Sequence, residues 1–77
     1  MATAKDAAKW MYEEVKSTGE LYQADAVDYI TEHFGEEHIY ENENGNPAIS
    51  REVLSEFKNL HGGKAVWDRS SFLWEWN

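Results

Sequence analysis

The sequence predicts one α+β domain, residues 1–77, built from three helices and small β-hairpins. The chain is long enough for one hydrophobic core and too short for two, since it has 77 residues. Apolar residues recur at helical spacing in three segments, and aromatic residues alternate near the C-terminus. Without cysteine there are no disulfides, so burial of apolar groups, among them four Trp, four Tyr and three Phe, must hold the fold together.

The first helix is predicted at residues 4–16. Thr3 can cap it, with Asp6 three residues further on. The positions expected to face the core are Ala7, Ala8, Met11 and Val15. The segment 17–19 should end the helix, and residues 20–22 form a short extended connector.

A second helix is predicted at residues 23–34, with Gly35 as its C-terminal cap. Its expected inner face is Ala26, Val27, Ile30 and Phe34. Residues 38–40 and 48–49 are short β-like pieces around an Asn44-Gly45 sequence that favours a tight turn, which predicts a hairpin.

Ser50 is positioned to cap a third helix at residues 51–61, which Gly62-Gly63 ends. Its expected inward residues are Val53, Leu54, Phe57 and Leu60. The tail predicts a second hairpin, with strands at 65–67 and 72–76 around a turn at 68–71. Its alternating aromatic residues, Phe72, Trp74 and Trp76, should share one face in the core.

This order of elements resembles a winged helix-turn-helix domain, in which the last helix is the recognition helix and the following hairpin is the wing. The residues that carry the resemblance are 21–23 before the second helix, 50–61 as the third helix and 64–76 as the wing. One departure is the connection at 35–49, which is far longer than the short turn of a DNA-binding helix-turn-helix.

The chain also resembles a small uncharacterised family of bacterial and phage proteins. Its members share a Phe-Gly-Glu-Glu stretch, an Asn-Gly turn and a Trp-rich end, here at 34–37, 44–45 and 67–76. This second resemblance supports the fold and implies no activity.

The charge is unevenly distributed. The formal net charge is −8, and residues 1–49 hold eleven acidic residues and three Lys, whereas residues 50–77 hold four acidic and four basic residues. An overall negative charge disfavours binding to nucleic acid through the whole surface. No apolar run is long enough to span a membrane and no apolar signal region is evident, so we expect a cytoplasmic protein without a membrane partner.

No motif predicts catalysis, a metal or a cofactor. A calcium loop around Gly45 fails because Tyr40 and Arg51 would occupy its first and twelfth positions. His33, Glu36, Glu37 and His38 lack a known ligand spacing for zinc or nickel. No serine lies in a nucleophile motif and no glycine pattern cradles phosphate. We therefore expect a protein that is not an enzyme.

The basic residues of the C-terminal third offer an alternative. Under a winged-helix arrangement, the residues that could share a nucleic-acid-binding surface are Arg51, Lys58, Lys64 and Arg69. The simpler interpretation is that they pair with local glutamates or keep a hairpin soluble. For the tryptophans, core packing is the better explanation than base stacking, although a partly exposed Trp67 or Trp76 would mark a protein interface.

The sequence thus favours a non-catalytic interaction module whose partner is another protein. The alternatives are a DNA-binding winged helix, which uses the third helix and the terminal hairpin, and an acidic inhibitor or DNA mimic, which uses the carboxylates of residues 13–43. The specific partner, the process and the oligomeric state stay open.

Overall fold

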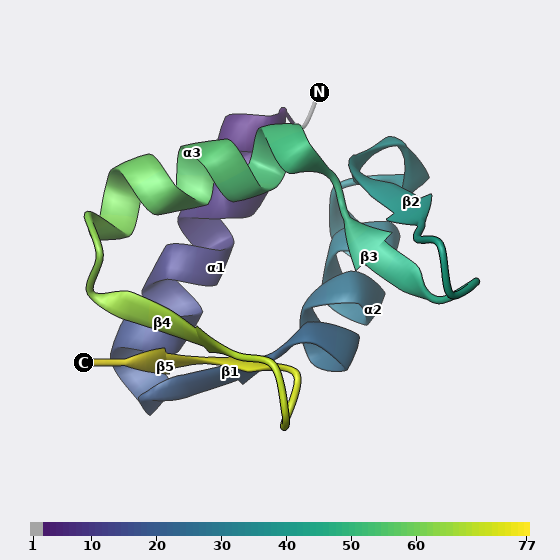
Figure 1. Cartoon of the computed structure of the whole chain (residues 1–77). Helices are drawn as coiled ribbons and strands as arrows, with labels where there is room; N and C mark the ends of the chain where they lie inside the picture. Colours follow the sequence, from purple (N-terminus) through teal and green to yellow (C-terminus); the bar gives the residue numbers. More distant parts are fainter. Residues whose placement is uncertain (1–2) are drawn as a thin grey trace.

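Three α-helices and two small antiparallel sheets make up the part of the chain that the computed structural model describes, residues 3–77 (Figure 1). The helices are α1 (Ala4–Thr18), α2 (Gln23–His33) and α3 (Arg51–His61), with a 3₁₀ turn η1 (Glu36–His38). The strands are β1 (Glu20–Tyr22), β2 (Ile39–Glu41), β3 (Pro47–Ile49), β4 (Ala65–Asp68) and β5 (Leu73–Trp76). The prediction of an α+β fold with three helices and small hairpins is confirmed.

The larger sheet has the order β1-β5-β4, so the last strand lies in its centre. The extended connector predicted at 20–22 is its first strand, and Leu21 pairs with Trp74. On the other side of β5, Trp67 pairs with the same residue. The smaller sheet is the predicted hairpin of β2 and β3, in which Tyr40 pairs with Ala48.

The core lies where α1 crosses α3 and the larger sheet closes over both (Figure 1). Small residues let the helices approach closely, since Ala7 and Ala8 are fully buried on α1. The large side chains that fill the centre are Met11, Val15, Ile30, Ile49, Val53 and Phe57. The inner face predicted for α1 is therefore confirmed.

The caps of α1 and α3 follow the prediction, whereas α2 ends at His33 and its C-cap is Phe34, not the predicted Gly35. The Thr3 hydroxyl accepts a hydrogen bond from the Asp6 N–H at 3.2 Å, and the Asp6 carboxylate accepts one from the Thr3 N–H at 3.0 Å. This is a complete capping box. The Ser50 hydroxyl accepts from the Val53 N–H at the start of α3, and Gly62 ends that helix with φ 57°.

The β2–β3 hairpin is built around one asparagine. The Asn42 side-chain oxygen accepts hydrogen bonds from the N–H groups of Asn44 and Asn46, at 3.0 and 3.1 Å. Gly45 supplies the positive φ, 77°, that the turn requires. The predicted hairpin is confirmed, but its loop spans residues 42–46 and Asn44 does not adopt a positive φ, so Asn44-Gly45 does not form the tight turn that the sequence favours.

Two expectations about the core are wrong. Leu60 is 41% exposed, because α3 crosses α1 at an angle and its last turn extends beyond it (Figure 1). Phe72 is 62% exposed and precedes β5 instead of starting it. Its φ of 54° turns the chain out of the strand conformation, so Phe72 does not continue the strand alternation of Trp74 and Trp76.

Within residues 3–77, no helix combines the length and apolar character that crossing a membrane requires.

Candidate functional site

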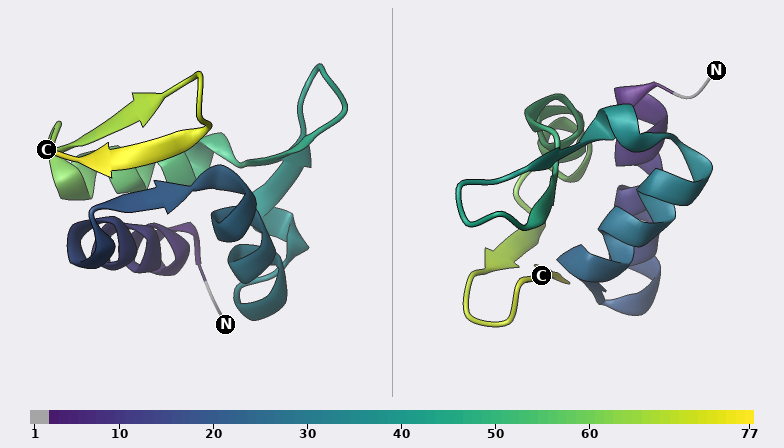
Figure 2. Two further views of the ribbon diagram at one scale, coloured as in Figure 1. Left: turned by 90° about the horizontal axis from the view of Figure 1, so that it is seen from below. Right: turned by 90° about the vertical axis from the view of Figure 1, so that its right-hand side faces the viewer.

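A groove of about 580 Å³ lies between α3 and the two hairpins. Figure 2 shows that the loops of both hairpins project toward the same side of the molecule, away from α1. The residues that line the groove are Gln23, Tyr40, Asn42, Ala48, Ile49, Leu54, Phe57, Lys58, His61, Gly63, Ala65, Trp67, Phe72 and Trp74. Segments far apart in the sequence thus form one surface.

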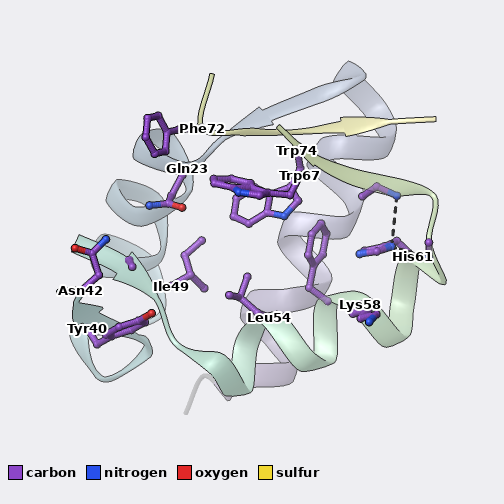
Figure 3. Close-up of a pocket in the computed structure, with 14 residues that line it drawn as sticks. Gln23, Tyr40, Asn42, Ile49, Leu54, Lys58, His61, Trp67, Phe72 and Trp74 are labelled. Carbon is purple, nitrogen blue, oxygen red and sulfur yellow. Dashed lines mark hydrogen bonds between the residues drawn. The ribbon is translucent and has the colours of Figure 1, made fainter. Parts of the chain in front are cut away.

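Aromatic rings form the wall of the groove on the side of the larger sheet (Figure 3). The ring centroids of Trp67 and Trp74 are 4.6 Å apart, and those of Trp67 and Phe72 are 6.3 Å apart. Trp74 is buried, whereas Trp67 is 36% exposed and Phe72 is more exposed still. Leu54 and Ile49 form the floor in the same view. The wall is therefore apolar, aromatic and open to solvent.

Phe72 is held in place by its backbone. It is the one residue other than glycine, among those described, that has a positive φ. Its carbonyl accepts a hydrogen bond from the Gln23 N–H at 2.9 Å, at the start of α2. A bulky residue in this left-handed region is uncommon because its Cβ approaches the backbone, which costs about 1–2 kcal/mol. Phe72 is thus an exposed aromatic ring on a strained backbone, and residues with a strained backbone cluster at active sites and ligand-binding sites.

The groove differs in charge from the acidic chain as a whole. The chain has fifteen acidic residues, yet none of the fourteen residues that line the groove is Asp or Glu. The one lining side chain with a permanent charge is Lys58, which lies with His61 at one end, while Tyr40 and Asn42 lie at the other (Figure 3). An apolar groove with a single cation is thus set in an acidic protein.

His61 closes the groove at the junction of α3 and β4. Its Nδ1 accepts hydrogen bonds from the N–H groups of Gly63 at 2.9 Å and Ala65 at 3.4 Å. Burial first, and the nearby charge of Lys58 second, lower the pKa of His61 below its usual 6.5. The neutral imidazole is therefore the form that organises this turn.

The turn at the tip of the β4–β5 hairpin depends on one carboxylate. Asp68 Oδ1 accepts hydrogen bonds from the Ser70 hydroxyl and from the N–H groups of Ser70 and Ser71. The bond from the Ser70 side chain, followed by the backbone bonds, lowers the pKa of Asp68. The Asp68 carboxylate thus stabilises the turn that precedes the exposed Phe72.

The four basic residues of the nucleic-acid alternative are all exposed. Arg51 opens α3, and Lys58 lies on the same side of this helix, since seven residues make about two turns. Lys64 precedes β4, and Arg69 lies in the turn of the terminal hairpin. Lys58 is the member of this set that lines the groove.

The metal candidates are not brought together. Among residues 3–77, no group of three or more His, Asp or Glu side chains is positioned to hold a metal ion. His33 stacks on Tyr29, with ring centroids 4.1 Å apart. His38 is buried, and its Nε2 has no hydrogen-bond partner among the described residues.

Sequence reasoning missed most of the groove. Trp67 was identified as a possible interface residue, and its exposure agrees with that expectation. The sequence pattern assigned Phe72 and Leu54 to the core, and Tyr40 was considered only as a position of a calcium loop around Gly45. One signal in the sequence could have indicated the groove. The C-terminal aromatic residues lie in a segment with few acidic residues, since Asp68 and Glu75 are the only two among residues 57–77.

Comparison with known proteins identifies a family but no activity. A family model described as a family of unknown function (DUF6953) matches residues 3–76, nearly the whole chain. No curated protein and no solved structure matches the chain.

Proposed function

Because the chain belongs to the DUF6953 family, whose function is unknown, we propose its function from its own surface: it is a non-catalytic module that binds another protein through the groove. The observation that carries this proposal is the exposed pair Trp67 and Phe72 at the edge of an apolar groove that contains no acidic residue. Exposed aromatic residues beside a concave apolar surface are typical of the energetic centre of protein interfaces.

The state of Phe72 supports the same proposal. A side chain that is 62% exposed contributes little to the core, so its strained backbone has no evident benefit for folding. The strain is understandable if the ring serves a partner, because binding sites tolerate local cost to the fold.

The experiment starts with an affinity pull-down from native cells and identification of the captured protein by mass spectrometry. The identified protein is then produced in pure form, and its affinity for the chain is measured by calorimetry. Phe72→Ser should weaken this binding at least about tenfold, the usual effect of losing a central interface residue. Tyr22→Ser is the matched control, since Tyr22 is also an exposed aromatic residue, at 44%, but does not line the groove.

Equal affinity of the two variants would place the interface elsewhere and reject the groove. The absence of any partner that binds directly would reject the protein-binding function.

A second candidate function is DNA binding by a winged helix. It is supported by the order of the elements, helix, strand, helix, helix and hairpin, and by the sheet order β1-β5-β4. The insertion of η1, β2 and β3 before α3 and the net charge of −8 weigh against it.

Salt separates this candidate from protein binding. If the exposed cations contact phosphates, the affinity for duplex DNA must fall with salt at a log–log slope of about −0.9 per contact. We expect no measurable binding at physiological salt. Micromolar binding that the double variant Arg51→Ala, Lys58→Ala abolishes without unfolding would establish DNA binding instead.

A further inference from the structure

One edge of the larger sheet lies beside the groove. In the order β1-β5-β4, β4 is an outer strand that pairs with β5 on one side and with no other strand of residues 3–77. Two hydrogen bonds show to which neighbouring strand each residue of β5 is bonded. The Asn77 N–H donates to the Lys64 carbonyl, on the β4 side, at 2.6 Å. The Trp76 N–H donates to the Gly19 carbonyl, on the β1 side, at 2.9 Å.

This pattern determines which backbone groups of β4 are free. In antiparallel sheets, hydrogen-bonded and non-bonded residue pairs alternate along the strand. Since Lys64 is bonded to β5, Val66 and Asp68 are bonded to it as well, through Glu75 and Leu73. Ala65 and Trp67 therefore direct their N–H and C=O groups to the outer edge.

His61 occupies only one end of this edge. Its Nδ1 accepts the Ala65 N–H, and no other residue of the described range 3–77 is hydrogen-bonded to the outward Ala65 carbonyl or to the backbone groups of Trp67. The side chains of the same two residues line the groove. The free hydrogen-bonding edge and the apolar groove are thus parts of one surface.

We propose, building on the protein-binding function above, that the partner binds as an extended peptide strand that pairs with the free edge of β4. Unpaired backbone groups on an outer strand are a template for strand addition, in which main-chain hydrogen bonds give affinity and side-chain pockets give specificity. Directly opposite residues point to the same face of a sheet. The peptide residue opposite Trp67 therefore places its side chain in the groove, which selects a large apolar residue.

The charges of the groove define the second feature of the peptide. Lys58 is the one permanently charged residue of the lining, and no carboxylate is present to pair with it there. A peptide with an acidic residue near the Ala65 end of β4 complements Lys58. A second copy of the chain fits less well, because both copies would carry a net charge of −8.

The test uses the intact chain and a phage-displayed library of random linear peptides as the probe. Enriched peptides are synthesised, and their binding is measured by fluorescence anisotropy. Amide exchange of the chain is followed by NMR with and without peptide. We expect the Trp67 N–H to exchange at least about tenfold more slowly in the complex, whereas the Val66 and Asp68 N–H groups, already bonded to β5, change little.

Two further measurements address the peptide and its charge. N-methylation of alternate peptide amides, those that face β4, should weaken binding at least about tenfold, and methylation of the others should not. With an acidic peptide, Lys58→Gln should weaken binding about threefold at low salt. Lys9→Gln, an exposed lysine on α1, is the matched control and should have no effect.

The outcomes separate this inference from the proposed function. In one outcome, peptides bind and Phe72→Ser weakens their binding, but the Trp67 amide stays unprotected and methylation of alternate peptide amides has no alternating effect. Strand addition is then wrong, and the groove function stands. If no peptide is enriched, strand addition is wrong, and the affinity of the natural partner for Phe72→Ser still decides the groove function. If peptides bind Phe72→Ser as well as the natural chain, both proposals fail. A chain that sediments as a dimer with a protected Trp67 amide before peptide is added would assign the edge to a second copy and overturn the inference.

Discussion

The indole of Trp74 meets the phenyl ring of Phe57 edge to face, with ring centroids 5.7 Å apart and an angle of 81° between the ring planes. This contact joins the central strand β5 to α3, and Trp74 is only 7% exposed. Trp74→Ala removes the contact and leaves a cavity, so it should lower the free energy of unfolding by about 3–5 kcal/mol. Urea unfolding followed by circular dichroism measures the change. An unchanged midpoint would contradict the core position of Trp74.

Phe72→Asn tests the strained backbone at the edge of the groove. Asn adopts the left-handed conformation more readily than Phe, so the variant should unfold with the same free energy or with up to about 1 kcal/mol more. At the same time it should lose affinity for groove-binding peptides. Thermal unfolding and anisotropy measure the two effects. A clear loss of stability would mean that the contact between Phe72 and Trp67 outweighs the backbone strain.

His38→Leu tests the buried imidazole. Its Nε2 is buried without a hydrogen-bond partner among residues 3–77, and an unsatisfied buried polar atom costs about 1–3 kcal/mol. Leu removes this atom, whereas the His38 carbonyl still accepts the Ser50 N–H. The free energy of unfolding should therefore rise by about 1 kcal/mol in chemical denaturation. His38→Gln, which keeps a polar group, should show no gain, and a loss in the Leu variant would reveal a partner for the nitrogen.

Stability should depend on pH through His61. Because its pKa is lower in the folded chain than the usual 6.5, the unfolded chain takes up a proton first as the pH falls. His61 therefore contributes its full share of the free energy of unfolding above about pH 6.5. This contribution is lost as the pH falls through the lowered pKa of His61 in the folded chain. Protonation of Nδ1 would also remove the acceptor for Gly63 and Ala65.

The measurement for His61 is the urea midpoint at about pH 7.5 and about pH 5.5. The natural chain is compared with His61→Asn. Between the two pH values, the free energy of unfolding of the natural chain should fall by a few tenths of a kcal/mol more than that of the variant. The difference is small because the His61 ring is partly open to solvent. Equal losses in both would assign the pH dependence to other groups.

Local signals in the sequence predicted the helices well. Thr3 and Ser50 cap their helices as expected, and α3 spans the predicted residues 51–61. Capping and helical periodicity act over a few residues, so they can be identified without knowledge of the tertiary structure.

The groove could not be predicted because it depends on distant segments. Leu21 pairs with Trp74 across most of the chain, and nothing in residues 20–22 indicates that partner. Phe72 breaks the aromatic alternation through a positive φ that Phe rarely adopts. The groove itself requires the relative placement of both hairpins, which is a tertiary property.

The central position of β5 also has a consequence for the kinetics of folding. Glu20 pairs with Glu75 and Ala65 with Trp76, so neither outer strand can join the sheet before β5 is in place. The β4–β5 hairpin is local, whereas Glu20 and Glu75 lie far apart in sequence, so the contact between β1 and β5 is slow to form because a long loop must close first. The helices and the β4–β5 hairpin can form early from local interactions, whereas β1 should join the sheet only late in folding.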